Sequence, residues 1–332
     1  MRRPARTTAL TAACAALLAL PACAHLPVVH APAAAGEHVP LVVQPAQAAR
    51  TAEAATAPLQ ALADPAAADL EALEQRVSGP ELALRRAAAT VAAAGVTPPA
   101  TGADDLDAIS SVLPRQGTWP HWFLTVTEPG EDAKPSLVVL RSPSAREPYR
   151  VWATPSLLPG ASLPTTGAPA EGAAVVAPDE DTNLPMSPAA VAERYADVLL
   201  EGDAGEFAGQ FTSDAYRQGV LASVEEQRRA LEAAGGSLTQ ERTLLEDPLL
   251  AVRTRDGGAL VVAGYRWTTT LRGPAGGLPG QLDPVLAALA GRASATGVTV
   301  VREEVVVFAV PPGQGEVAAI AVQSGPVSVE AS

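Results

Sequence analysis

The stretch 298–310, VTVVREEVVVFAV, decides the fold, because no other segment of the chain is as rich in residues that favour strands. Three further β-rich runs accompany it, at 237–253, 259–271 and 316–322. Asp256-Gly257 is a favourable hairpin turn between the first two of these runs. The C-terminal part of the chain is therefore predicted to hold about four antiparallel strands.

Helical segments precede these strands. Ser187 can cap a helix whose first turn contains Pro188. A second helix is expected at 207–221, and Ser223 with Glu226 forms a capping box that predicts the start of a third. Helices followed by antiparallel strands indicate an α+β unit in which the helices cover one face of a curved sheet.

The preceding part of the chain repeats this order on a smaller scale. A helical pattern runs from 41 to 95 and is followed by short β-rich runs at 122–127, 136–141 and 149–155. Acidic residues at 104, 105 and 107 are expected to cap a short helix at 106–112. Two units of helices packed on small antiparallel sheets are thus predicted, and a tandem repeat is a hypothesis.

The predicted domain organisation has five parts. They are a signal peptide at 1–22, a flexible tether at 23–40, an N-terminal α+β domain at 41–164, a linker at 165–186 and a C-terminal α+β domain at 187–329. The linker is predicted from its content of Pro, Gly, Ala and acidic residues without periodicity.

The N-terminus has the pattern of an export signal. Three arginines within the first six residues precede an apolar run at 8–20, which is about thirteen residues long and too short to span a bilayer. Leu20-Pro-Ala-Cys23 then resembles a lipobox, which predicts cleavage before Cys23 and a lipid on its thiol. A simple secretory signal with an incidental Cys23 is the alternative, and both general secretory and twin-arginine export remain open.

The composition narrows the possible partners. The chain carries a net charge of −13, which disfavours binding to nucleic acid and to anionic lipid headgroups. The lipid on Cys23 is therefore the expected membrane anchor, on the extracytoplasmic face of the plasma membrane. Cys14 leaves with the signal, so Cys23 is the only cysteine of the mature chain and no intramolecular disulfide is expected.

The sequence contains no motif that defines a reaction. Beyond the tether, His121 is the only histidine, no Gly-x-Ser-x-Gly is present, and the lone Lys134 does not lie in a phosphate loop. We predict no metal site and no cofactor. A non-catalytic binding or interaction protein of the cell envelope is favoured, and an envelope enzyme or small-ligand binder is the alternative.

Two groups of residues are candidates for a site. Glu303 and Glu304 point to opposite faces of their strand, so one of them can face a cavity of the C-terminal domain together with Tyr265 or Arg266. A solvent-exposed or edge position is the alternative for these acids. The second group is aromatic and forms either an interaction surface or part of the core; its members are Trp119, Trp122, Tyr149 and Trp152.

Four segments carry a resemblance to a known group of proteins: VSGPELALRRAA (77–88), WPHWF (119–123), AREPYRVWATPSLLPGASLP (145–164) and SPAAVAERYADVLLEG (187–202). They are similar to uncharacterised actinobacterial secreted lipoproteins that contain a domain of unknown function. The order of elements in the C-terminal unit also resembles the cone-shaped NTF2-like and cystatin-like domains. The resemblance implies an extracytoplasmic lipoprotein and supplies no catalytic residue.

Overall fold

The computed structural model describes residues 39–332 except 63, 101–105, 128–134, 275–276 and 279, and without the side chains of 246–248. Val39–Ser332 form one compact unit that mixes helices and antiparallel sheets, which confirms the α+β class. The signal peptide, Cys23, nearly all of the tether, and the acids at 104 and 105 lie outside the described residues.

The larger sheet contains the strands predicted for the C-terminal part of the chain. Its order is β6-β11-β10-β9-β8, all antiparallel, and its strands are β6 (Ser156–Leu157), β8 (Ser237–Arg253), β9 (Ala259–Arg272), β10 (Gly297–Val310) and β11 (Ala318–Ala331). Gly257 adopts a φ of +93° in the β8–β9 turn, as expected for an Asp-Gly hairpin. The last strand continues well past residue 322, where the sequence pattern ended.

The smaller sheet has the order β1-β3-β4-β5 and is also antiparallel. Its strands are β1 (Ala108–Val112), β3 (His121–Thr127), β4 (Leu137–Ser142) and β5 (Arg150–Ala153). The helix predicted at 106–112 is wrong, because Ser110, Ser111 and Val112 pair with β3 instead. The four strands of the smaller sheet lie in chain order, and so do β8 to β11 of the larger sheet, whereas β6 is added beside β11. The shared order fits the repeat hypothesis but does not decide it. Two short strands, β2 (Pro114–Arg115) and β7 (Ala173–Ala174), form a separate parallel pair.

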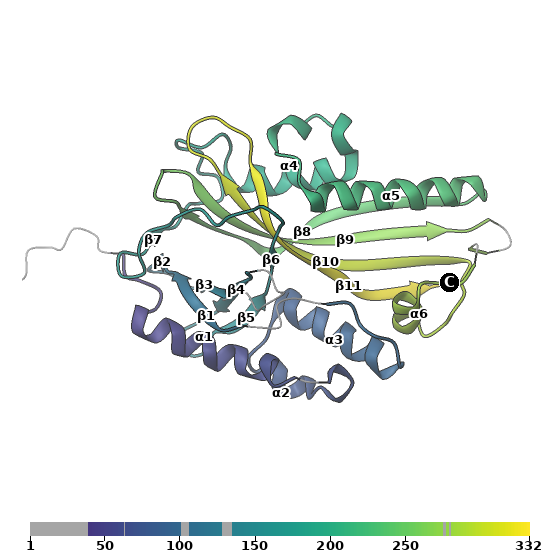
Figure 1. Ribbon diagram of the computed structural model, residues 1–332, viewed down its shortest axis with the longest axis horizontal. Coiled ribbons are helices and arrows are strands. Elements are labelled where there is room, and N and C mark those ends of the chain that lie inside the picture. Colours follow the sequence, from purple (N-terminus) through teal and green to yellow (C-terminus); the bar gives the residue numbers. More distant parts are fainter. Residues whose placement is uncertain (1–38, 63, 101–105, 128–134, 275–276, 279) are drawn as a thin grey trace, which may run out of the picture. The chain divides into compact units, whose positions relative to one another are not determined.

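The elements form four layers (Figure 1). One face of the smaller sheet packs on α1 (Pro45–Gln60) and α2 (Leu70–Glu74), and its other face packs on the larger sheet. The opposite face of the larger sheet, here called the helix face, is covered by α4 (Pro188–Glu201) and α5 (Ala215–Ala233). The larger sheet extends beyond the smaller one, and there it contacts α3 (Gly79–Ala93) and α6 (Pro284–Ala290).

The helix caps agree with the sequence in one place and differ in another. Ser187 accepts a hydrogen bond from the Ala190 amide at 3.3 Å, as predicted for the start of α4. The helix break predicted between 221 and 223 is wrong, because α5 runs through Ser223 and is capped by Asp214. Only short 3-10 turns separate α4 from α5: η2 (Gly202–Ala204) and η3 (Ala208–Gln210). A third such turn, η1 (Pro65–Ala67), follows α1.

The segment predicted as a linker, 165–186, packs against the rest of the chain. It contains β7, and its side chains Val176 and Leu184 are buried in the core beneath α4. Val175 also forms a bridge to Val252 of β8. The regions predicted as two domains, 41–164 and 187–329, belong to one compact unit, because apolar residues of the intervening segment pack on β8 and α4.

Candidate functional site

The predicted ligand residues separate into two pairs on opposite faces of the larger sheet. Glu303 lies opposite Arg266 on the neighbouring strand, and Glu304 lies opposite Tyr265. The Arg266 guanidinium donates to Glu303 at 2.9 Å on the face away from α5, and Arg266 is half exposed. Glu304 and Tyr265 face α4 and α5 and are fully buried. The structure thus joins Glu303 to Arg266 and places Glu304 beside Tyr265, but it does not bring all four residues into one site.

Glu304 is at the centre of a buried polar cluster. Tyr216 of α5 donates its hydroxyl to the Glu304 Oε2 atom at 2.6 Å, and Arg242 of β8 donates to Oε1 at 3.2 Å. The Arg242 and Glu304 side chains are 1% and 0% exposed, so the ion pair lies in a low-dielectric environment. Tyr265 instead donates to the Ala192 carbonyl of α4 at 3.1 Å.

The tyrosines of this cluster remain protonated at neutral pH. Burial, reinforced by the Glu304 carboxylate, raises the pKa of Tyr216 well above 10.0. The same two causes raise the pKa of Tyr265. A phenol in this state donates a hydrogen bond and does not act as a base at neutral pH. Each Glu304 oxygen also accepts a hydrogen bond from within the cluster, so the interactions of these residues fix one another's positions.

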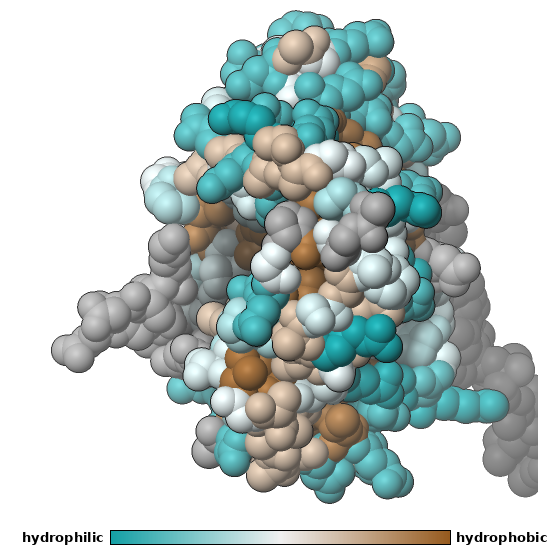
Figure 2. Space-filling model, turned by 90° about the vertical axis from the view of Figure 1, so that its right-hand side faces the viewer, coloured by the Kyte–Doolittle hydropathy of each residue, from teal (hydrophilic) through white to brown (hydrophobic). Residues whose placement is uncertain are grey.

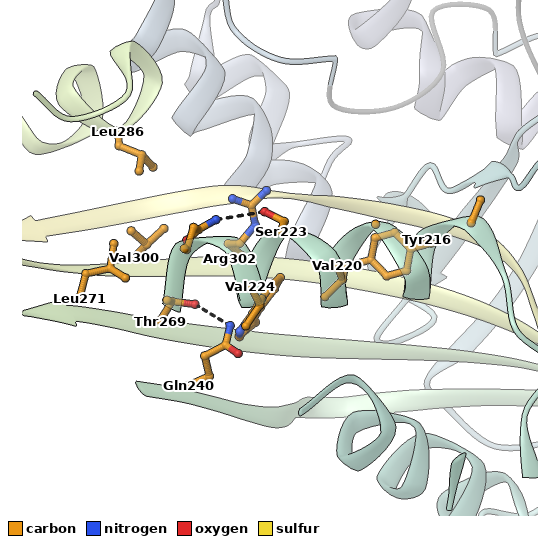
Figure 3. Close-up of a pocket in the computed structure, with 14 residues that line it drawn as sticks. Tyr216, Val220, Ser223, Val224, Gln240, Thr269, Leu271, Leu286, Val300 and Arg302 are labelled. Atoms are coloured by element: carbon orange, nitrogen blue, oxygen red, sulfur yellow. Dashed lines mark hydrogen bonds between the residues drawn. The ribbon is translucent and has the colours of Figure 1, made fainter. Parts of the chain in front are cut away.

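A pocket of about 360 Å³ adjoins this cluster, between α5 and the helix face of the sheet. Figure 3 shows side chains of α5, the sheet strands and α6 converging on it. Apolar and polar side chains contribute to the lining in similar numbers. The main apolar residues are Val220, Val224, Trp267, Leu271, Leu286 and Val300, and the polar ones include Ser223, Gln227, Gln240, Thr269, Tyr216 and Arg302.

Arg302 is the charged residue that lines this pocket. Its guanidinium lies 5.9 Å from the centre of the Trp267 ring, and that of Arg242 lies 4.6 Å from the same ring. Within the described part of the chain Arg302 has no acidic partner within ion-pairing distance, and its buried Nε–H group donates to no acceptor there. Burial lowers the pKa of Arg302. The buried indole Nε1 of Trp267 also lacks a hydrogen-bond partner among the described residues.

Four residues of this site were not expected from the sequence: Tyr216, Arg242, Trp267 and Arg302. One signal was available, because Arg302 stands two residues before Glu304 and therefore points to the same face of the strand. The other residues on this face of the strand, from Val298 to Val310, are apolar, so Arg302 and Glu304 are two charges in a face expected to be buried. The pairing with Tyr216 and Arg242 carries no comparable signal in the sequence.

The aromatic group lies mostly in the interior. Trp122 and Trp152 are 3% and 5% exposed and pack between the two sheets. Tyr149 is partly buried and packs on the core between α1 and the smaller sheet. Its hydroxyl donates to the Val42 carbonyl at 3.1 Å. Trp119 is exposed and stacks on His121, with ring centres 3.7 Å apart. Of the four, Trp119 alone presents its ring to solvent.

The chain belongs to a family described as a domain of unknown function (DUF8094), whose pattern matches residues 44–329. No curated protein and no solved structure matches the chain. Among the described residues, no group of three or more His, Cys, Asp or Glu side chains is placed to hold a metal ion. In the same part of the chain, none of the helices has the length and apolar character needed to cross a membrane.

Proposed function

We propose that this protein is a non-catalytic binding protein of the cell envelope, and that it takes a small ligand into the pocket between α5 and the larger sheet. The observation that carries this proposal is Arg302, a mostly buried cation on the pocket wall without an anionic partner in the described chain. Burying a charge without a partner is costly, so proteins keep such groups where a ligand completes them.

The neighbouring cluster supports binding over catalysis. An acid–base mechanism that used Glu304 would need its carboxylate to exchange a proton with a substrate. Glu304 is instead held by Tyr216 and Arg242 and is fully buried. It positions Tyr216 and the sheet beside the pocket, and its own oxygens do not line that pocket.

The proposal includes the attachment of the protein to the membrane as a lipoprotein. Cleavage before Cys23 would leave a lipid-modified N-terminus joined to residue 39 through a short tether, on the extracytoplasmic face of the plasma membrane. The support is the order of arginines, short apolar run and LPAC in the sequence, together with the similarity to actinobacterial lipoproteins. The lipid would be the attachment to the membrane, and the folded unit would carry the ligand site.

The NTF2-like or cystatin-like kinship belongs to the same proposal. Its support is the chain order of α4 and α5 followed by a four-stranded meander, β8 to β11, whose one face these helices cover. In such an arrangement, the helix face is the natural place for a ligand pocket.

The pocket is tested by filling it. Gly219 of α5 lines the pocket, and a Cβ built on it meets no atom within 4 Å. Gly219→Phe should therefore place a ring in the pocket mouth without disturbing the helix. Full-length wild type and variant are expressed in an actinobacterial host, extracted in mild detergent, and compared by native mass spectrometry and by analysis of released small molecules.

The wild type should carry a bound small molecule that Gly219→Phe lacks. Ala222→Phe is the matched control, because Ala222 is an exposed α5 residue outside the pocket lining. It should retain the molecule. Equal recovery from wild type and Gly219→Phe, or none from either, would overturn the proposed site.

Lipid attachment and membrane localisation are tested separately with Cys23→Ala. This variant should lose metabolic labelling with a fatty acid and should leave the membrane fraction. A variant that is still lipid-labelled and membrane-bound would contradict the lipoprotein assignment, whatever the result for the pocket.

A further inference from the structure

We propose that the pocket selects a monocarboxylic acid with an apolar body, and that Arg302 receives its carboxylate. This inference rests on the proposed ligand-binding function and names the class of ligand. It follows from the charge balance of the pocket and from the order of polar and apolar groups along the strands.

The charge balance requires one negative charge. Arg242 and Arg302 lie against the same Trp267 ring, whereas the one acid in this cluster is Glu304, which accepts from Arg242. Within the described chain, the arrangement therefore has one cation in excess. A ligand with a single negative charge neutralises it, and a guanidinium offers paired donors that match the two oxygens of a carboxylate.

The strand register orders the pocket from a polar to an apolar end. Along β10 the residues of the helix face are Val300, Arg302 and then Glu304, and their partners on β9 are Thr269, Trp267 and Tyr265. Tyr216 closes the polar end, and its hydroxyl donates to Glu304, which lies behind it outside the pocket lining. The opposite end is formed by Leu271, Val300 and Leu286, and Figure 3 shows Arg302 between these apolar side chains and Tyr216.

The apolar end lies toward the outside of the molecule. Val298 and Val300, with Leu271, Leu286 and Leu289, belong to a cluster at the far end of the larger sheet. Figure 2 faces this end, and hydrophobic surface is visible there between more polar residues. A ligand that enters with its carboxylate first would therefore bring that group inward to Arg302. Its apolar chain would then lie against the side chains at the apolar end of the pocket.

Size and charge favour a carboxylate over a phosphate. A volume of about 360 Å³ lies near the lower limit of small-molecule sites, roughly 300 Å³. A phosphate monoester carries close to two negative charges at neutral pH, about −1.5 to −2, and a second charge would have no cation in this pocket. A medium-chain fatty acid fits both conditions.

The test measures the binding of octanoate, octanol and octyl phosphate to the full-length protein by isothermal titration calorimetry at pH 7. Any ligand already in the pocket is first removed by an organic wash, and the detergent concentration is the same in the protein and ligand solutions. We expect octanoate to bind at least ten-fold more tightly than octanol and than octyl phosphate. Arg302→Gln should lower the octanoate affinity at least ten-fold and leave the octanol affinity within two-fold. Arg229→Gln is the control and should change neither affinity, because Arg229 is an exposed arginine of α5 outside the pocket lining.

The outcomes separate this inference from the proposed function. Equal affinities for octanoate and octanol, or an octanoate affinity that Arg302→Gln leaves unchanged, would overturn the role of Arg302 while the pocket still binds. Tighter binding of octyl phosphate would overturn the single-charge assignment. If none of the three probes binds but wild type releases another molecule that Gly219→Phe lacks, the ligand class is wrong and the proposed site stands.

Discussion

The two halves of the helix face of the larger sheet are built differently. Under α4, the rings of Tyr195, Phe211 and Phe308 pack in tilted and edge-to-face pairs with ring centres 4.9 to 6.5 Å apart, and the space is filled. Under α5, the core contains Val224, Leu231, Leu238 and Trp267, and a pocket remains. The chain has only four Phe, four Tyr and four Trp. Three phenylalanines and two tyrosines lie in or against the α4 half, whereas Trp267 is the aromatic residue of the α5 cluster, where the pocket remains.

The Glu304 cluster marks the border between the halves, and breaking it should have the largest effect. Glu304→Leu leaves Arg242 charged, buried and unpaired, and it also removes the acceptor of Tyr216. We expect the free energy of unfolding in urea to fall by about 5 kcal/mol, the upper end of the range for a broken buried pair.

Glu303→Leu is the matched control on the neighbouring residue. Its partner Arg266 is 53% exposed, so solvent screens that pair and the loss should stay below about 1 kcal/mol. Similar losses for the two variants would show that the border is not held by the buried pair.

Leucines in the two halves give the next comparison. Leu199 of α4 is 2% exposed in the filled core, and Leu231 of α5 is 7% exposed in the smaller cluster. Leu199→Ala should lower the free energy of unfolding by about 4 kcal/mol and Leu231→Ala by about 2 kcal/mol, because a leucine with more packed neighbours leaves a larger cavity. Urea unfolding curves measure both, and an equal loss would mean that the halves are packed alike.

The sequence could predict the elements that depend on local patterns but not those that depend on tertiary packing. Strands β8 to β10, the Asp-Gly turn and the Ser187 cap depend on local patterns, and the structure confirms them. Ser223 and Glu226 also form a local pattern, yet α5 continues through them. Val220, Val224 and Leu231 lie along its buried side against Trp267, and this tertiary packing outweighs the capping signal.

The candidate site was predictable only in part. The alternation of β10 correctly separates Glu303 from Glu304, and it also places Arg302 beside Glu304. The partners Tyr216 and Arg242 lie 88 and 62 residues from Glu304 in the chain. No local pattern encodes such pairings, so a single sequence cannot distinguish a buried, satisfied carboxylate from one that faces a ligand.

Tyr216 provides a test of intermediate size that depends on pH. Tyr216→Phe removes a hydrogen bond to a charged group and should cost about 2 kcal/mol at pH 7. The pKa of Tyr216 is raised well above 10.0, so the folded protein keeps the proton while the unfolded chain loses it above pH 10. The stability contributed by Tyr216 is therefore complete below pH 10 and is lost as the pH rises toward the folded pKa.

Unfolding in urea at pH 7, 9 and 11 measures this effect. The difference in stability between wild type and Tyr216→Phe should be constant from pH 7 to 9 and should narrow at pH 11. A difference that widens at pH 11 would contradict the assigned direction of the pKa shift.

The smallest effect should come from two glycines, one beside the pocket and one between the sheets. Gly219→Ala adds a methyl group where no atom lies within 4 Å and replaces a poor helix former, so it should raise the free energy of unfolding by about 0.8 kcal/mol. Gly264→Ala places its methyl group 3.0 Å from Leu245 and Trp152, where the sheets meet, and should lower it. Thermal unfolding gives the two signs directly. A gain for Gly219→Ala would show that an added group at this position meets no obstruction, whereas a loss would contradict the open position assigned to Gly219.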